Sequence, residues 1–266
     1  MKQERSYTSP AAPEELERII YAYSEAWEGR LETTVDLGAA LLRIQPTYGT
    51  VARLAFPESD VKNRLDALIA EVQERAGRCL WIVGPGTQPA GLDRRLMSRG
   101  FTVFFDCDGL VLEDLTVHIP RSPEVVVEPL SRATVQDYAE RCSDAPDPAW
   151  HRYLLESAYR YLNSPKREVE IYVALVGGEV AGYSVLRTEP TGVAYLANAM
   201  IVKEFRNRGV YSSLTAHRLD VARVAGCTVA FCAAQSKTSA PILIRRGFKP
   251  VCRFRYLVPP RTRDSA

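Results

Sequence analysis

Residues 199–214, AMIVKEFRNRGVYSSL, predict a strand that enters a tight basic turn and continues at once into a helix. The first backbone N–H groups of such a helix have no helical partners, and they favour an anion. Gly209 lets the backbone approach a ligand closely, and Arg206 and Arg208 add positive charge. A pyrophosphate fits this description, and a basic loop in front of an ordinary helix fits the same residues.

The residues around this turn predict a mixed sheet flanked by helices. Gly177 and Gly178 predict a two-residue hairpin turn. Strands are expected at residues 125–128, 168–176, 180–187, 193–202, 228–233 and 249–258, and helices at 131–142, 147–162, 211–225 and 240–246.

The turn and its surroundings resemble the GNAT (GCN5-related N-acetyltransferase) superfamily. Arg206 and Gly209 occupy the first two fixed places of its acetyl-CoA signature, Arg/Gln-x-x-Gly-x-Gly/Ala. The order of hairpin, long strand, signature helix, strand, short helix, Gly-Phe and final strand also matches, over residues 124–258. The resemblance implies acetyl-CoA as the co-substrate.

The resemblance also implies a set of cofactor-binding residues. The backbone of Ala199, Met200 and Ile201 would hold the pantetheine arm, and Ser236 stands where the family often has an Asn that contacts the cofactor. With Arg206 as the first signature residue, the implied pyrophosphate cradle is Asn207, Arg208, Gly209, Val210, Tyr211 and Ser212.

Two positions depart from the family pattern. The last small residue of the signature is Tyr211 here, but a side chain in the first helical turn need not block the backbone N–H groups, so we still expect cofactor binding. Family members often carry a Tyr in the short helix after Ser236, placed to protonate the leaving thiolate, and this sequence has Leu243. The proton must then come from solvent, from the substrate ammonium or from another side chain.

Side chains on the neighbouring strands are candidates for that proton transfer. Tyr195 and Asn198 lie on the strand before the signature, Cys232 on the next and Tyr256 on the last. Tyr195 and Tyr256 carry phenols, whose ordinary pKa is about 10. We therefore take Tyr195, Asn198 and Tyr256 as candidate catalytic residues, with a structural role in the core as the alternative for each tyrosine.

The first half of the chain resembles the later part of the same fold without the signature. The sequence RRLMSRGF at residues 94–101 resembles ILIRRGF at 242–248, and each follows a short strand and precedes another. Such a repeat indicates duplication. The turn before the helix at 60–76 reads FPESD, whose two acids would repel a pyrophosphate, so this half is expected to be a degenerate GNAT-like unit.

These patterns predict an α/β protein made of two tandem GNAT-like folds, each a twisted mixed sheet flanked by helices. The break at residues 116–123 contains two prolines and few packing residues, so we expect one domain at residues 1–118 and the other at 124–258. Whether the first half shapes the substrate pocket or only supports the fold is left open.

Composition narrows the function classes. Hydrophobic residues make up 46% of the 266-residue chain and the net charge is +2, so neither nucleic acid nor a strongly acidic partner is expected. The six cysteines form no CxxC pair and the three histidines are scattered, which argues against a metal site. The charged N-terminus and the lack of an apolar run of about 18 residues predict a cytoplasmic protein without a membrane segment.

The sequence therefore predicts an acetyl-CoA-dependent N-acetyltransferase that acts on a small-molecule amine by direct transfer. One alternative is a non-catalytic acyl-CoA-binding sensor or partner protein, which Leu243 favours. Another is an enzyme that transfers a different acyl group or uses a thiol or hydroxyl acceptor. Self-association into a homodimer is left open.

Overall fold

The computed structural model describes residues 12–26, 33–45, 49–142, 148–165, 167 and 169–260, without the side chains of residues 21–26 and 148–150. The first half contains α1 (Ala12–Ala26), β1 (Thr33–Asp36), β2 (Leu41–Ile44), β3 (Gly49–Ala52), α2 (Val61–Ala76), β4 (Cys79–Val83), α3 (Leu92–Met97) and β5 (Thr102–Leu112). The second half contains β6 (Val125–Pro129), α4 (Val135–Arg141), α5 (Pro148–Asn163), β7 (Glu170–Val176), β8 (Glu179–Glu189), β9 (Val193–Ile201), the 3-10 turn η1 (Lys203–Phe205), α6 (Val210–Val224), β10 (Val229–Gln235), α7 (Ser239–Ile244) and β11 (Lys249–Val258).

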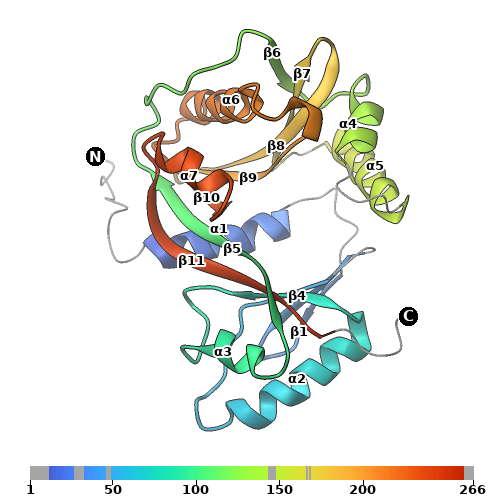
Figure 1. Cartoon of the computed structure of the whole chain (residues 1–266), viewed down its shortest axis with the longest axis vertical. Helices are drawn as coiled ribbons and strands as arrows, with labels where there is room; N and C mark the ends of the chain where they lie inside the picture. The colour runs from blue at the N-terminus through green and yellow to red at the C-terminus, as the bar shows by residue number, and fades with distance from the viewer. Residues whose placement is uncertain are drawn as a thin grey trace.

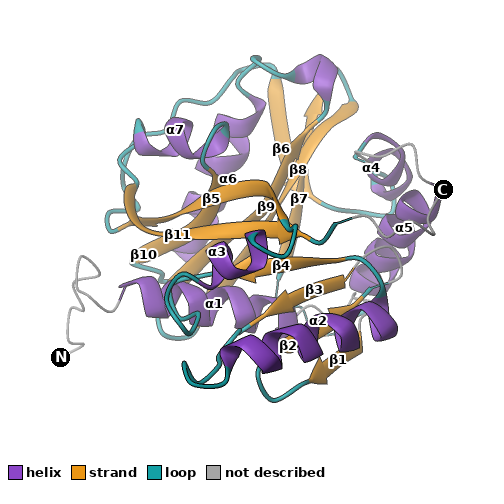
Figure 2. Ribbon diagram, turned by 60° about the horizontal axis from the view of Figure 1, so that its bottom comes forward, coloured by secondary structure: helices purple, strands orange, loops and turns teal. Residues whose placement is uncertain are grey.

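All of these strands join one mixed sheet, which confirms the predicted α/β class. The strand order is β1-β2-β3-β4-β11-β5-β10-β9-β8-β7-β6. Only β3–β4 and β9–β10 pair in parallel, and every other neighbouring pair is antiparallel. The helices cover the twisted sheet along its length, with α6 over the second half and α2 over the first (Figure 1, Figure 2).

The two halves exchange their final strands. β11, the last strand of the chain, pairs with β5 and with β4 of the first half. β5, the last strand of the first half, pairs instead with β10 of the second half. The two long strands therefore cross from one half to the other and lie side by side at the centre of the sheet (Figure 1).

The same element order occurs in both halves. Three antiparallel strands lead through a helix to a parallel strand, then to a short helix and a final strand. Both short helices end as predicted: Gly100 and Gly247 have φ of 86° and 96°. The N–H of Phe101 donates to the Leu96 carbonyl, that of Phe248 donates to the Leu243 carbonyl, and both rings are buried.

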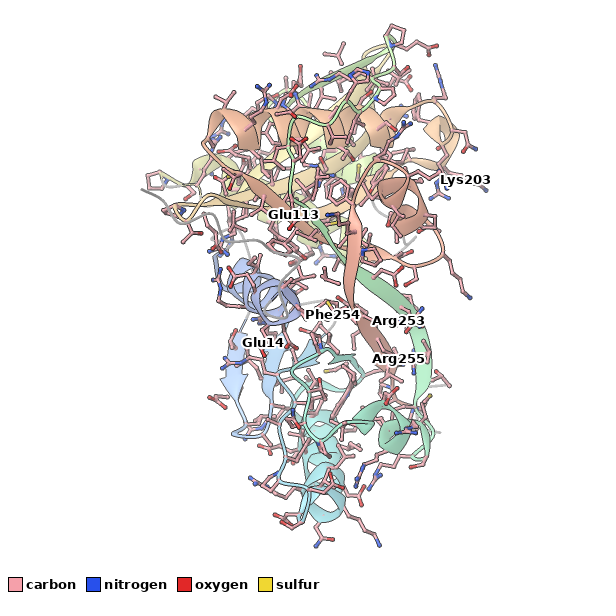
Figure 3. All side chains as sticks on the ribbon, turned by 90° about the vertical axis from the view of Figure 1, so that its left-hand side faces the viewer. Glu14, Glu113, Lys203, Arg253, Phe254 and Arg255 are labelled. Atoms are coloured by element: carbon pink, nitrogen blue, oxygen red, sulfur yellow. The ribbon has the colours of Figure 1, made fainter. Side chains whose placement is uncertain are left out.

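Helix α1 belongs to the first half in sequence but packs against the second half. Leu16 and Ile19 are fully buried in the same hydrophobic cluster as the second-half core. Arg18 forms an ion pair with Glu189 at the end of β8, with 2.7 Å between nitrogen and oxygen. Figure 3 shows α1 beside β11, with Phe254 between them and Arg253 on the outer side of the strand. A separate cluster around Trp81 forms the core of the first half under α2.

Some local predictions need correction. Strands β1 and β2 were not predicted. Strand β3 ends at Ala52 because Arg53 takes a positive φ of 54°. The helix expected at 131–142 begins at Val135, since Ser131 and Thr134 close a turn first. The hairpin at Gly177 and Gly178 is confirmed, with φ of 61° and 86°. Among the described helices, none is long and apolar enough to cross a membrane.

Candidate functional site

The pairing of strands β9 and β10 ends partway along the two strands. Their parallel ladder contains the pairs Val193–Val229, Ala194–Ala230 and Tyr195–Phe231, and it stops there. β9 then continues to Ile201 along β8, while β10 continues to Gln235 along β5. Ligands bind at such openings beyond the carboxyl ends of parallel strands. The sheet thus opens a split that leads from Tyr195 toward the turn before α6.

That turn presents the start of α6 without a side-chain cap. Gly209 is the N-cap residue, with φ of 78°, and Asn207 also has a positive φ of 63°. The first-turn N–H groups, including those of Val210, Tyr211 and Ser212, lie at the positive end of a 15-residue helix. The local geometry is that of an anion-binding helix N-terminus.

Gly209 also has a neighbour that the sequence did not predict. A Cβ atom at this position would lie 2.9 Å from the Cβ of Ser122, which belongs to the segment between the halves. The N–H of Ser122 donates to Ser213 Oγ at 3.0 Å. The close approach that requires glycine here is therefore, in this structure, the approach of the connecting segment to α6.

The two arginines of the turn are exposed and held differently. Arg206 Nε donates to the carbonyl of Ile201 at 3.2 Å, which folds its guanidinium back over the end of β9. Arg208 Nη2 pairs with Glu124 Oε2 at 2.5 Å, and its guanidinium lies over the ring of Phe205. Arg208 thus shares its charge with an acid of the connecting segment.

Ala199, Met200 and Ile201 form the last part of β9, beside the split. Their ladder partners are Ser184, Tyr183 and Gly182 of β8, on the side away from β10. Ala199 is exposed, and Met200 and Ile201 are half-buried. The end of β9 is therefore paired on one side and lies along the split on the other.

Ser236 follows β10 and is fixed by a strand of the first half. Its N–H donates to the Asp106 carbonyl at 3.0 Å, and its hydroxyl donates to Asp108 Oδ1 at 2.7 Å. Both aspartates lie on β5. Sequence reasoning missed them because it assigned β5 to the other half, and only the strand exchange brings them to this site.

Tyr211 points inward from the first turn of α6. Burial raises the pKa of its phenol, and the neighbouring Cys232 raises it further, whereas Arg218 and a hydrogen bond with Ser239 lower it. Burial also raises the pKa of the Cys232 thiol to about 12. The phenol therefore lies near Cys232 of β10 and Ser239 at the start of α7.

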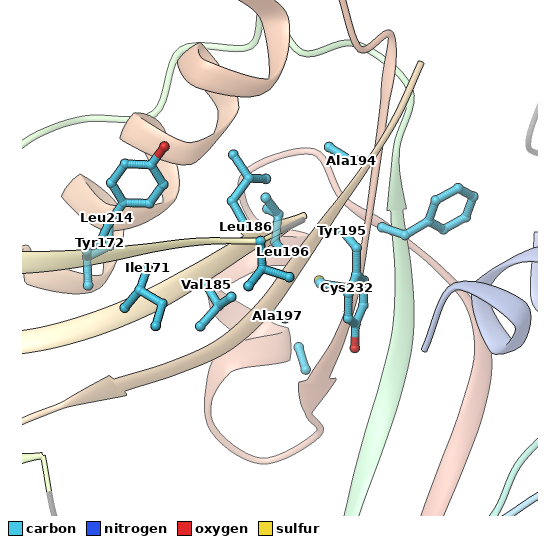
Figure 4. Close-up of a cluster of buried hydrophobic side chains, with 14 of the residues drawn as sticks. Ile171, Tyr172, Val185, Leu186, Ala194, Tyr195, Leu196, Ala197, Leu214 and Cys232 are labelled. Carbon is cyan, nitrogen blue, oxygen red and sulfur yellow. The ribbon is translucent and has the colours of Figure 1, made fainter. Parts of the chain in front are cut away.

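The structure brings Tyr195 to the split but not Tyr256. Tyr195 is 7% exposed, lies on the last β9–β10 ladder pair and points away from α6, whereas Tyr172 and Leu186 point toward that helix (Figure 4). Tyr256 lies on β11 between Ile82 and Phe105, with 4.4 Å between its ring centroid and that of Phe105. Two strands, β5 and β10, separate it from β9.

Asn198 and Leu243 complete the set of singled-out residues. The β8–β9 register passes from Val185–Ala197 to Ser184–Ala199, so Asn198 is the extra residue of a β-bulge, and its φ is 21°. Leu243 is 2% exposed in α7 and packs in the core.

In the part of the chain that the structure describes, no group of three or more His, Cys, Asp or Glu side chains is arranged to hold a metal ion.

Comparison with known proteins agrees with this geometry. Residues 132–248 match the model of the acetyltransferase (GNAT) family. No curated protein matches the chain. A GCN5-related N-acetyltransferase from Kribbella flavida superimposes with a TM-score of 0.64 at 17% identity, over 94% of this chain and 97% of its own.

Two further solved structures share the fold. A GCN5-related N-acetyltransferase from Sphaerobacter thermophilus gives a TM-score of 0.61 at 16% identity, over 93% of this chain and 89% of its own. A tandem GNAT protein from the clavulanic acid biosynthesis pathway gives 0.57 at 15%, over 84% and 80%. The whole sheet thus has the fold of these proteins, and residues 132–248 are similar in sequence to the acetyltransferases of the GNAT family.

Proposed function

We propose that the chain transfers the acetyl group of acetyl-CoA directly to the nitrogen of a small-molecule amine. The observation that carries this proposal is the split between β9 and β10, which leads from a buried tyrosine to a basic, uncapped helix N-terminus. A thioester at the inner end of the split and a pyrophosphate at the helix would use both features at once.

The cofactor contacts in this proposal come from three segments. The pantetheine arm lies along Ala199, Met200 and Ile201. These residues pair with β8 on one side, and their other edge faces the split. Ser236, held by Asp108, borders the arm from the other side. The pyrophosphate meets the N–H groups and charges of Arg206, Asn207, Arg208, Gly209, Val210, Tyr211 and Ser212.

The reaction in this proposal is an attack of a neutral amine on the thioester carbonyl carbon. The new C–N bond pushes the carbonyl π pair onto oxygen, and when that pair returns, the C–S bond breaks and sulfur leaves as the CoA thiolate. The nitrogen releases one proton and the thiolate takes one up. Backbone N–H groups of β9 stabilise the negative oxygen, and the protein positions the two reactants.

Tyr195 is the better candidate for the proton donor of the two phenols. It lies at the split, whereas Tyr256 is two strands away. Leu243, buried and apolar, offers no proton.

We also propose that the chain arose by duplication, with a degenerate first domain at residues 1–118 and the active domain at 124–258. The repeated element order and the matching Gly-Phe helix ends support a duplication. Glu58 and Asp60 at the start of α2 support the loss of the cofactor site there.

The test combines binding and turnover on the full chain. Native mass spectrometry and calorimetry with acetyl-CoA should show one molecule bound per chain, and a thiol-release assay over a panel of small amines should identify an acceptor. Tight binding with no transfer or hydrolysis to any amine, thiol or alcohol would instead favour the acyl-CoA-binding sensor, the alternative that Leu243 supports. Tighter binding of a longer acyl-CoA would replace acetyl as the transferred group.

A further inference from the structure

A buried arginine of α6 forms hydrogen bonds with the backbone at the bulge in β9. Arg218 lies on α6 and is 2% exposed. Its Nη1 donates to the carbonyls of Ala197 at 3.0 Å and Val185 at 3.1 Å, and its Nε donates to the Leu214 carbonyl at 3.4 Å. Val185 and Ala197 form the last regular ladder pair before the register skips Asn198. The guanidinium thus bridges both strands at the point where the bulge begins.

This contact fixes the orientation of one peptide group. The carbonyl of Ala197 belongs to the peptide bond that also carries the N–H of Asn198, and across a trans peptide these two dipole ends point in opposite directions. Because the carbonyl points to Arg218 on the α6 side, the N–H of Asn198 points away from α6. Tyr195, three residues earlier, points to that same side of the sheet (Figure 4).

The contact also changes the polarity of that peptide. A cationic donor on a carbonyl oxygen draws electron density toward it and makes the N–H at the other end a stronger hydrogen-bond donor. The surroundings are dry, since Val185, Ala197 and Leu214 are all buried, so this polarisation is little screened. The peptide group at the bulge is thereby held in one orientation and polarised.

We propose that Arg218 is a positioning residue that orients and polarises the Ala197–Asn198 peptide so that its N–H stabilises the oxyanion formed from the acyl carbonyl. This inference rests on the proposed function, because it needs a thioester at the inner end of the split. The sequence gives little hint of the role, since a single arginine in the middle of a helix resembles a solvated surface residue.

The test compares Arg218→Met with Arg223→Met. Both remove one cation from α6, but Arg223 is exposed and forms an ion pair with Asp220 of the same helix at 3.4 Å. Acetyl-CoA labelled with 13C at the acyl carbonyl reports polarisation directly through the infrared C=O stretch of the bound molecule. Steady-state kinetics with the acceptor found in the amine panel supply kcat and KM.

In the unmodified protein, the C=O stretch of bound acetyl-CoA should lie below that of free acetyl-CoA. Arg218→Met should return the stretch toward the free value and lower kcat by about 10²–10³-fold, as when one oxyanion donor is lost, with the acetyl-CoA Kd changed by less than about 3-fold. Arg223→Met should alter none of these quantities. An Arg218→Met protein with an unshifted stretch and kcat would overturn the inference.

Arg218→Lys covers the case in which the methionine variant does not fold. Lysine has one donor nitrogen, which cannot take the place of Nη1 on the Ala197 and Val185 carbonyls and of Nε on the Leu214 carbonyl at the same time, so we expect kcat to fall at least about 10-fold with Kd kept. Full kcat and a full carbonyl shift in Arg218→Lys would contradict the positioning role. If the unmodified protein itself binds no acetyl-CoA or shows no transfer, the proposed function fails instead, which is a different result.

Discussion

Helices α2 and α6 occupy equivalent places in the two halves, yet their first turns have opposite character. Each leads from three antiparallel strands to a parallel strand. At α6 the N-cap is Gly209, preceded by Arg206 and Arg208; at α2 the N-cap is Asp60, preceded by Glu58. Shared topology therefore places a helix N-terminus after the third antiparallel strand of each half, and the residues of the turn decide what each can bind.

In the first half, carboxylates lie at the start of α2, and their negative charge disfavours a ligand anion there. Glu58 pairs with Arg95, and Asp60 with Arg64 at 3.8 Å. Glu17 of α1 reaches the loop after β4 and accepts the N–H of Gly86 at 2.7 Å. A helix start that is already supplied with acids is stabilised in itself and repels a phosphate. The comparison shows that the two helix starts differ in charge although they occupy equivalent places in the sheet.

The largest expected effect comes from separating the halves. A chain that starts at Pro123 lacks β5, so β10 and β11 lose their shared neighbour and expose unpaired edges. We expect this fragment to be insoluble or largely unfolded by circular dichroism and sedimentation. Coexpression with residues 1–122 should restore a soluble complex. If the fragment alone folds and binds acetyl-CoA as tightly as the full chain, the first half is only an appendage.

Gly209→Glu should abolish acetyl-CoA binding, because its carboxylate faces the pyrophosphate. Gly209→Ala is the matched control, since it has the same close contact with Ser122 and the same positive φ without the charge. We expect Gly209→Ala to bind more weakly than the unmodified protein but measurably in calorimetry. Two acetyl-CoA sites per chain, or unchanged acetyl-CoA binding in Gly209→Glu, would contradict the proposal that only the second half binds the cofactor.

Tyr195→Phe should lower kcat by about 10²-fold with unchanged acetyl-CoA affinity, the scale of a general acid. Tyr256→Phe, on the strand paired with the first half, should leave kcat within about 3-fold while retaining the ring stack on Phe105. The two variants thus ask whether the chemistry is confined to the second-half split. Full turnover in Tyr195→Phe would exclude its phenol as the proton donor.

The charges at the start of α6 should have modest effects. Arg206→Ala and Arg208→Ala should each weaken acetyl-CoA binding by about 0.5–1.5 kcal/mol, as expected for exposed charged contacts. Glu124→Gln should tighten binding slightly, because it frees Arg208 from its ion pair. Calorimetry at two salt concentrations measures all three. Weaker binding in Glu124→Gln would show that the acid helps to form the site.

Lowering the pH should remove stability from the two halves in different pH ranges. Burial lowers the pKa of His217 in α6 below its ordinary value of 6.5, so the unfolded chain binds more protons and stability falls as pH drops through that range. Arg99 lowers the pKa of the exposed Asp66 in α2 below 3.8, and that contribution is lost only at lower pH. Between pH 7.5 and pH 5.5, the free energy of unfolding measured in urea should fall less in His217→Phe than in the unmodified protein. In Asp66→Asn it should fall by the same amount as in the unmodified protein. An equal loss in all three proteins would exclude His217.

Local sequence signals predicted most of the helices and strands, because they depend on periodicity and on turn residues such as Gly177, Gly178, Gly100 and Gly247. The signature turn was also located correctly at the start of α6. Strands β1 and β2 were missed because each has four residues and too few positions to show alternation.

The strand exchange could not be read from the sequence. Nothing in residues 102–112 or 249–258 states which parallel strand each will join, since both follow the same short helix and Gly-Phe turn. This pairing brings Asp106 and Asp108 to Ser236 and moves Tyr256 away from β9. Arg218 was missed for a similar reason, because its burial depends on how α6 packs on β8 and β9.

The exchanged strands also set an order of events during synthesis. Domains usually fold from the N-terminus as the ribosome releases them. Here β4 cannot gain its inner neighbour until residues 249–258 emerge, after the other strands of the second half. The first half is therefore made early but completed only after β10 and α7 have been made, and a premature stop before residue 249 would leave both halves unfinished.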